Sequence, residues 1–174
     1  MRGLKGKNVI VTGGASGIGQ AISLRLGEEG CNVGIFDLNG DGANGVAEKI
    51  RAAGGTANGY ACDISDYSVV ESMVGAFESD CGPVDGLVNN AGWDKSMPFL
   101  DTDLELWHKV VAINLYGPLN LCHVVLKGMA ERGGGRMCAS VTGLPALRSA
   151  LLRWTRGCQF EDAAHHTLSA CPPF

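Results

Sequence analysis

Residues 9–19 decide the fold, and they read Val-Ile-Val-Thr-Gly-Gly-Ala-Ser-Gly-Ile-Gly. The β-branched run at residues 9–12 is typical of a strand that is buried on both faces of a sheet. The glycines allow a tight turn, and the apolar positions that follow have helical spacing up to a stop near Gly30. The stretch therefore predicts a strand, a glycine-rich turn and a helix in succession.

The same alternation continues along the chain. Helices are expected at residues 43–53 and 67–78, and two more between 101 and 131 with a break or kink near Gly117-Pro118. Further strands are expected at residues 32–37, 57–63 and 84–89, and from Arg136. This order requires right-handed crossovers. We therefore predict the α/β class, a Rossmann-type doubly wound parallel sheet with helices on both faces.

Composition limits the function. The chain has 174 residues, 45% of them hydrophobic, and a formal net charge of −4. The acidic balance argues against binding nucleic acid or acidic membranes through bulk positive charge. No unbroken apolar run approaches the ~18 residues that cross a bilayer, and no signal-peptide pattern precedes the first strand. We expect a soluble, cytoplasmic protein.

The cysteines do not indicate a cross-linked or metal-binding protein. There are seven, an odd number, without a C-x-x-C pair, which favours reduced thiols. His165-His166, with Glu161 and Cys158, fits no standard zinc-ligand spacing. We expect no metal site.

The glycine turn suits a dinucleotide. Glycines let the backbone approach a pyrophosphate, and the helix N-terminus offers free N–H groups and partial positive charge. Asp37 lies 24 residues after Gly13, at the end of the second expected strand. A carboxylate there can accept hydrogen bonds from a ribose and would repel a 2′-phosphate, and Leu38 and Asn39 add no cation. The pattern favours NAD over NADP, with a surface acid or helix cap at Asp37 as the alternative.

Four motifs in order resemble the short-chain dehydrogenase/reductase family across residues 5–143. They are the loop T-G-x-x-x-G-x-G at residues 12–19, the acidic residue at Asp63-Ile64, the N-N-A-G at residues 89–92 and a helix asparagine at Asn114. Trp93-Asp94, after the N-A-G, is similar to bacterial dehydrogenases of cyclic alcohols, such as those acting on 2-hydroxycyclohexanecarboxyl-CoA. The resemblance implies hydride transfer between NAD(H) and a secondary alcohol or ketone, by a homo-oligomer.

The resemblance also implies a role for each matching residue. Phosphate and ribose would be bound by Gly13, Ser16, Gly17, Ile18 and Gly19, the adenosine ribose by Asp37 with Leu38, the adenine by Asp63 and Ile64, and the nicotinamide side by Asn90, Ala91 and Gly92. Asn114 would hold a water in the proton relay, and Ser140 would polarise the substrate oxygen. The alternatives are structural: Asn89 and Asn90 as strand caps, Asp63 as a helix cap, Asn114 as a core amide, and Trp93 as a packing residue.

The chemistry of the family is incomplete in this sequence. The family uses a tyrosine as general acid/base, with a lysine four residues later. Residues four positions after the three tyrosines, Tyr60, Tyr67 and Tyr116, are Ile64, Glu71 and Asn120, so no Y-x-x-x-K exists. The position expected for the tyrosine is occupied by Arg153. We expect this chain to be a poor or inactive catalyst.

The last residues differ in composition. Residues 144–174 contain no valine, isoleucine, lysine or tyrosine, but three of the six prolines. We divide the chain into an NAD(P)-binding Rossmann domain at 1–143, the N-terminal portion of the family fold, and an atypical tail at 144–174 that is frame-shifted or disordered. The C-terminal part of the fold would be missing, which would leave the sheet uncovered beyond the fifth strand. A non-catalytic NAD-binding or interaction module, or a non-functional truncated product, is the alternative to an enzyme.

Overall fold

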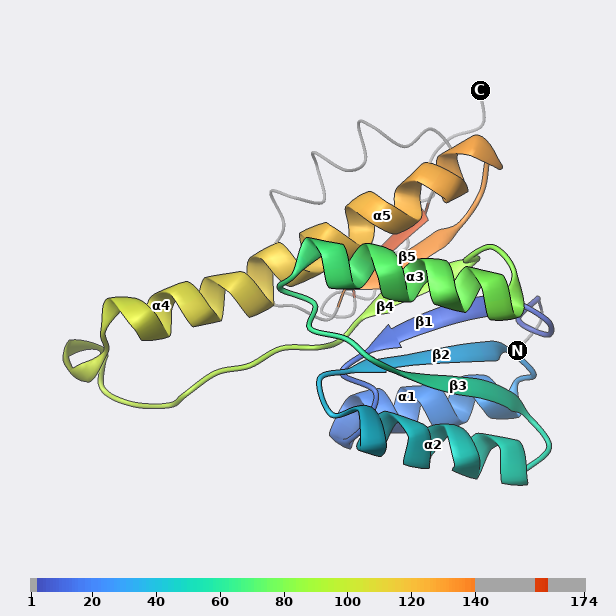
Figure 1. Ribbon diagram of the computed structural model, residues 1–174, viewed down its shortest axis with the longest axis horizontal. Helices are drawn as coiled ribbons and strands as arrows, with labels where there is room; N and C mark the ends of the chain where they lie inside the picture. The colour runs from blue at the N-terminus through green and yellow to red at the C-terminus, as the bar shows by residue number, and fades with distance from the viewer. Residues whose placement is uncertain (1–2, 140–158, 163–174) are drawn as a thin grey trace.

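The computed structural model of the chain describes residues 3–139 and 159–162. In this part of the chain the strands are all parallel and form one sheet in the order β3-β2-β1-β4-β5-β6 (Figure 1). The strands are β1 (Asn8–Thr12), β2 (Asn32–Asp37), β3 (Thr56–Ala61), β4 (Gly86–Asn89), β5 (Arg136–Ala139) and β6 (Gln159–Asp162). The order reverses between β1 and β4, and this confirms the predicted doubly wound parallel sheet.

Helices cover both faces of the sheet (Figure 1). They are α1 (Gly17–Glu28), α2 (Gly40–Ala52), α3 (Tyr67–Cys81), α4 (Leu104–Val111) and α5 (Gly117–Glu131), with a 3₁₀ turn η1 (Phe99–Asp101) and a π segment η2 (Ala112–Tyr116). Side chains of β1 alternate between the two layers: Ile10 packs in the core with α3 and α5, and Val9 and Val11 pack in the core with α2. The run at residues 9–12 is buried throughout, as expected.

Two helices differ from the expected bounds because of their caps. α2 begins at Gly40 rather than residue 43, since Asn39 Oδ1 accepts a hydrogen bond from the Gly42 N–H at 3.0 Å. α3 continues beyond residue 78 to Cys81, and Gly82 ends it with a positive φ of 90°. Both differences extend a predicted helix and leave the order of elements unchanged.

The two helices expected between residues 101 and 131 form one continuous run. Pro118 has no N–H to donate to the carbonyl of Asn114 four residues earlier, so the regular bonding ladder fails there. The chain passes this point through η2, where the Gly117 N–H bonds to the carbonyl of Ala112, five residues back. The expected break near Gly117-Pro118 is therefore a local widening of the helix.

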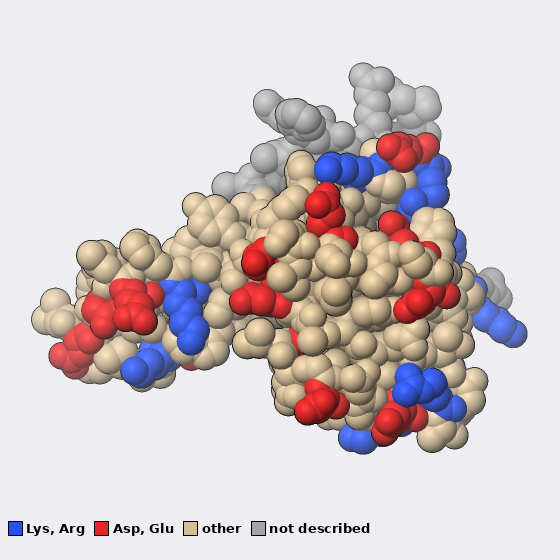
Figure 2. Space-filling view, in the orientation of Figure 1, with Lys and Arg blue, Asp and Glu red and all other residues tan. Residues whose placement is uncertain are grey.

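By length and composition alone, the run Leu104–Glu131 is able to cross a membrane, with a mean hydropathy of 1.3 over 18 residues. Core helices of water-soluble folds pass the same test, and α5 buries Leu121, Val125 and Met129 against the sheet and α3. The visible surface in Figure 2 carries both signs of charge over α4 and acidic groups over α3. A cytoplasmic location stays a prediction.

The sheet does not end at β5. β6 pairs with β5 in parallel, from Arg136 opposite Gln159 to Ala139 opposite Asp162. The expectation of an uncovered edge at this side of β5 is therefore wrong, because backbone groups of β6 take up its hydrogen bonds. Apart from β6, the predicted tail at residues 144–174 lies outside the described residues, and its proposed origin stays a prediction.

Candidate functional site

The glycine turn lies at the carboxyl end of β1 and is packed too closely for side chains. Gly13 has a φ of +65°, and a Cβ there would lie 2.8 Å from the Cα of Ala91. A Cβ on Gly19 would overlap the carbonyl oxygen of Gly13 and lie 2.6 Å from Asn90 Nδ2. The turn thus brings the backbones of residues 13 and 91 into contact, and it requires glycine at both positions.

The start of α1 can receive an anion. Ser16 is the N-cap with extended backbone, and its hydroxyl makes no capping bond, so it is available to another partner. Gly17 has a φ of +53°, and a Cβ there would meet nothing within 4 Å. The N–H groups of a first helical turn have no partner within the helix, and they carry the positive end of its dipole. Ile18 is 74% exposed beside them.

Asp37 is held beside the glycine turn by backbone donors. Its Oδ2 accepts a hydrogen bond from the Ala15 N–H and its Oδ1 from the Asn39 N–H, both at 2.9 Å. The carboxylate is half-buried at the end of β2, and each oxygen keeps a further lone pair for a ligand. Leu38, next in the chain, is 77% exposed. The alternative of a helix cap at Asp37 is wrong, because Asn39 caps α2.

Thr12 joins the glycine turn to the end of β4, a role that sequence reasoning did not assign. Its buried Oγ1 accepts hydrogen bonds from the N–H groups of Asn90 and Ala91, both at 3.0 Å. The Asn90 amide donates in return to the Thr12 carbonyl at 3.1 Å. These bonds place Asn90, Ala91 and Gly92 at the same edge of the sheet as the turn. In the sequence, the signal for this role was the threonine that begins the T-G-x-x-x-G-x-G motif at residues 12–19.

Asp63 and Ile64 follow β3 but differ in exposure. The Asp63 carboxylate is exposed and accepts from the N–H and hydroxyl of Ser65, at 2.9 and 2.6 Å. The Ile64 side chain is buried in the core, where a Cβ on Gly117 would come within 2.5 Å of its Cδ1. Only the backbone of Ile64 can therefore face a ligand at this edge.

The interpretation of Asp63 as a helix cap is wrong. Asp66 caps α3, accepting from the N–H groups of Ser68 and Val69 at 2.8 and 3.2 Å. Hydrogen bonds from the Ser68 hydroxyl, and then from these N–H groups, lower the pKa of Asp66. Asp63 is therefore left without a capping role.

Asn114 lies in the π segment and contacts the loop that follows β4. Its Oδ1 accepts from the Trp93 N–H at 3.0 Å, and its Nδ2 donates to the Trp93 carbonyl at 2.7 Å. Both ends of the side-chain amide thus have a backbone partner, but the residue is half-buried and not the core amide of the structural alternative. The role of Asn114 in a proton relay stays a prediction, and Ser140 lies outside the described residues.

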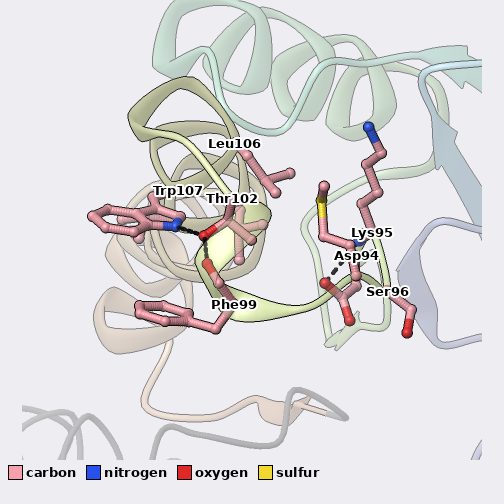
Figure 3. A pocket seen from close by; sticks show the side chains of 10 residues that line it. Asp94, Lys95, Ser96, Phe99, Thr102, Leu106 and Trp107 are labelled. Atoms are coloured by element: carbon pink, nitrogen blue, oxygen red, sulfur yellow. Dashed lines mark hydrogen bonds between the residues drawn. The ribbon is translucent and has the colours of Figure 1, made fainter.

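Beyond Trp93 the chain runs away from the sheet to α4 (Figure 1), where it borders an open hollow of about 440 Å³. Figure 3 shows Phe99 and Trp107 on one side of this hollow and Asp94, Lys95 and Ser96 on the other. The rings of Phe99 and Trp107 stack at 5.6 Å, and Trp107 Nε1 donates to Thr102 Oγ1 at 2.7 Å. None of the predicted site residues lines the hollow.

Buried thiols lie beneath the site. Burial, and then the charges of Asp63 and Asp66, raise the pKa of Cys62 to about 12. Burial also raises the pKa of Cys122 to about 12, although a hydrogen bond from Asn89 opposes the shift. The described residues contain no group of three His, Cys, Asp or Glu side chains that could hold a metal ion.

Comparisons with known proteins agree with this arrangement. The family model described as short chain dehydrogenase matches residues 7–148. The chain is 39% identical over 132 residues to a D-threitol dehydrogenase of Mycolicibacterium smegmatis, covering 76% of this chain and 51% of that protein. It is 36% identical over 137 residues to a fatty acyl-CoA reductase of Mycobacterium tuberculosis, covering 77% of this chain and 46% of that protein. The chain spans about half the length of these curated relatives.

Solved structures also match. A 7α-hydroxysteroid dehydrogenase in complex with NADH and 7-oxo glycochenodeoxycholic acid superposes with a TM-score of 0.82 at 27% identity, over 91% of this chain and 70% of that chain. A short-chain type dehydrogenase/reductase from Mycobacterium marinum superposes with a TM-score of 0.76 at 28% identity, over 79% of this chain and 54% of that chain.

Proposed function

Because the chain belongs to the short chain dehydrogenase family, we propose that it serves hydride transfer between NAD(H) and a secondary alcohol or ketone. The observation that carries this proposal is the close contact of the glycine turn with Asn90 and Ala91 beside the start of α1. That contact forms a cradle without side chains, next to the free N–H groups of a helix N-terminus.

The residues present fit a dinucleotide. Gly13, Ser16, Gly17, Ile18 and Gly19 would hold the pyrophosphate and its ribose, Asp63 with the backbone of Ile64 the adenine, and Asn90, Ala91 and Gly92 the nicotinamide side. Bound nicotinamide would supply the hydride acceptor or donor. The protein's own part is to fix these groups along the carboxyl edge of the sheet.

NAD is the preferred cofactor in this proposal. The Asp37 carboxylate, held by the N–H groups of Ala15 and Asn39, is placed to accept hydrogen bonds from ribose hydroxyls. The same negative charge would repel a 2′-phosphate, and the exposed neighbour Leu38 offers no cation to offset it.

The substrate class proposed here is a cyclic or hydroxyacyl secondary alcohol, or the matching ketone. Trp93 follows Gly92 directly, and in this proposal its large aromatic ring would lie on the nicotinamide side. The resemblance of Trp93-Asp94 to dehydrogenases of cyclic alcohols supports the cyclic class. Relatives named for threitol, fatty acyl-CoA and steroid substrates indicate how widely substrates vary among similar proteins.

Turnover by the 174-residue chain should be slow. The sequence has no Y-x-x-x-K, and loss of a general acid/base typically costs ~10²–10⁴-fold in rate. Asn114 and Ser140 are the remaining candidates for catalytic elements, with Asn114 holding a water and Ser140 polarising the substrate oxygen. An NAD-binding module that performs no catalysis is the alternative, although the similar proteins are named as dehydrogenases and reductases.

A fluorescence titration with NADH tests the proposal. Saturable binding of NADH, tighter than that of NADPH, is expected, together with slow or no oxidation of cyclohexanol in the presence of NAD. Absence of saturable binding would refute the proposed function. Binding with no detectable turnover on cyclohexanol or on a hydroxyacyl thioester would favour the non-catalytic module.

A further inference from the structure

A lysine from α4 covers the aromatic ring that begins the loop after β4. Lys109 Nζ lies 4.2 Å from the centroid of the Trp93 ring. An ammonium at this distance over an indole face is attracted by the negative face of the ring. The contact joins two segments that are 16 residues apart in the sequence.

The same helical run holds Trp93 at two points. Asn114, five residues after Lys109, bonds to both backbone groups of Trp93 and fixes where its Cα lies. Lys109 contacts the ring itself and so limits how the side chain rotates. Backbone bonds alone do not fix χ1 and χ2 of Trp93, whereas the lysine contacts the ring and so favours one orientation of it.

The orientation of this ring matters because of its place in the chain. Trp93 follows Gly92, the last residue of the motif at the nicotinamide side, and it is half-buried. Trp93 keeps part of its surface exposed, and a ligand would pack on apolar ring surface that the Lys109 ammonium does not cover. Flat apolar rings pack well on such a face, whereas a short acyclic chain covers little of it.

We propose that Lys109 is a positioning residue that holds the Trp93 indole as a wall of the substrate site and thereby favours cyclic over small acyclic secondary alcohols. This inference rests on the proposed function. Lys109 takes no part in hydride or proton transfer, and its effect acts through Trp93.

The first arm of the test monitors the orientation of the Trp93 ring by fluorescence, in the absence of cofactor. In a Trp107→Phe/Trp154→Phe background, emission comes from Trp93 alone. Lys109→Met keeps most of the side-chain length but removes the charge, and it should shift the Trp93 emission and raise its quenching by acrylamide. Lys109→Arg retains a cation that binds aromatic faces, and it should restore both signals. Unchanged emission in Lys109→Met would overturn the positioning role.

The second arm measures the preference of the protein for a cyclic over an acyclic alcohol. Saturation-transfer NMR with NAD present gives the dissociation constants of cyclohexanol and butan-2-ol. The ratio that favours cyclohexanol should fall about two- to fivefold in Lys109→Met and recover in Lys109→Arg, the range expected for loss of one partly exposed cation–π contact. An unchanged ratio would overturn the effect on specificity. Failure of every variant to bind NADH would refute the proposed function instead, since the emission arm needs no cofactor.

Discussion

Asn114 makes two hydrogen bonds to the backbone of Trp93, accepting from its N–H at 3.0 Å and donating to its carbonyl at 2.7 Å. The side-chain amide thus bonds to both backbone groups of Trp93, as the backbone of a neighbouring strand would, although it projects from a helix. Asn114 lies in the π segment, where Pro118 interrupts the regular helical hydrogen bonding. The chain leaving β4 is thereby fixed at the residue after the N-N-A-G motif.

Replacing Asn114 should loosen this loop. Asn114→Ala removes both bonds and should lower the free energy of unfolding by about 1–3 kcal/mol. Asn114→Asp should be at least as damaging, because a carboxylate oxygen would face the Trp93 carbonyl. Urea unfolding gives the stability, and Trp93 emission in a Trp107→Phe/Trp154→Phe background reports on the loop.

Asn120→Ala is the matched control for Asn114. Asn120 lies on α5, and its amide donates to the carbonyls of Ile64 and Ser65 at 2.9 and 3.3 Å. It should also lose stability, while the emission of Trp93 stays unchanged. Equal emission changes in both asparagine variants would show that Asn114 has no specific hold on Trp93.

Gly19→Ala should abolish the cradle. The added Cβ would overlap the Gly13 carbonyl and press on the Asn90 amide, so the turn must move. We expect NADH affinity to fall at least about tenfold, in line with the cost of overpacking a tight site. Fluorescence titration with NADH measures the change.

Gly75→Ala is the corresponding control glycine. It lies on the exposed side of α3, and a Cβ there would meet nothing within 4 Å. It should stabilise the protein by about 0.5–1 kcal/mol, since alanine is the better helix former, and it should leave the NADH titration as it is. Weaker NADH binding in both variants would mean that global destabilisation, rather than the cradle, explains the result for Gly19.

Asp37→Ser combined with Leu38→Arg should reverse the cofactor preference. The double variant removes the charge that repels a 2′-phosphate and adds a cation next to it. The ratio of NAD to NADP affinity should fall by about ten- to a hundredfold, the size of losing a charged hydrogen bond. Parallel titrations with NADH and NADPH measure the ratio. Leu38→Gln is the control, because it makes residue 38 polar without adding a positive charge. An unchanged ratio in the double variant would show that Asp37 does not face the ribose.

The sequence was most informative where the structure is local. The strand, turn and helix around Gly13 follow from neighbouring residues, and the place of Asp37 follows from the next strand. Contacts between distant segments could not be predicted, because no pattern in one sequence links Trp93 to Lys109 or to Asn114. The π segment had a local signal in Pro118, which sequence reasoning interpreted as a break. β6 begins 20 residues after β5 ends, in a stretch whose composition gave no sign of a strand.

The buried thiols predict how stability changes at alkaline pH. Burial raises the pKa of Cys62 and Cys122 from an ordinary value of 9.0 to about 12 in the folded protein. Between these values the unfolded chain loses protons that the folded protein keeps, so stability falls as pH rises above 9. At pH 10 each thiol should lower the free energy of unfolding by about 1.4 kcal/mol relative to pH 7.5. Urea unfolding at both pH values measures this difference.

Cys122→Ala should reduce the loss of stability at pH 10 by that amount. Val125→Ala, which creates a cavity on the same helix but removes no titrating proton, should leave the loss unchanged. The same pH-dependent loss in the wild-type protein and in Cys122→Ala would contradict the assignment of the shift to this thiol.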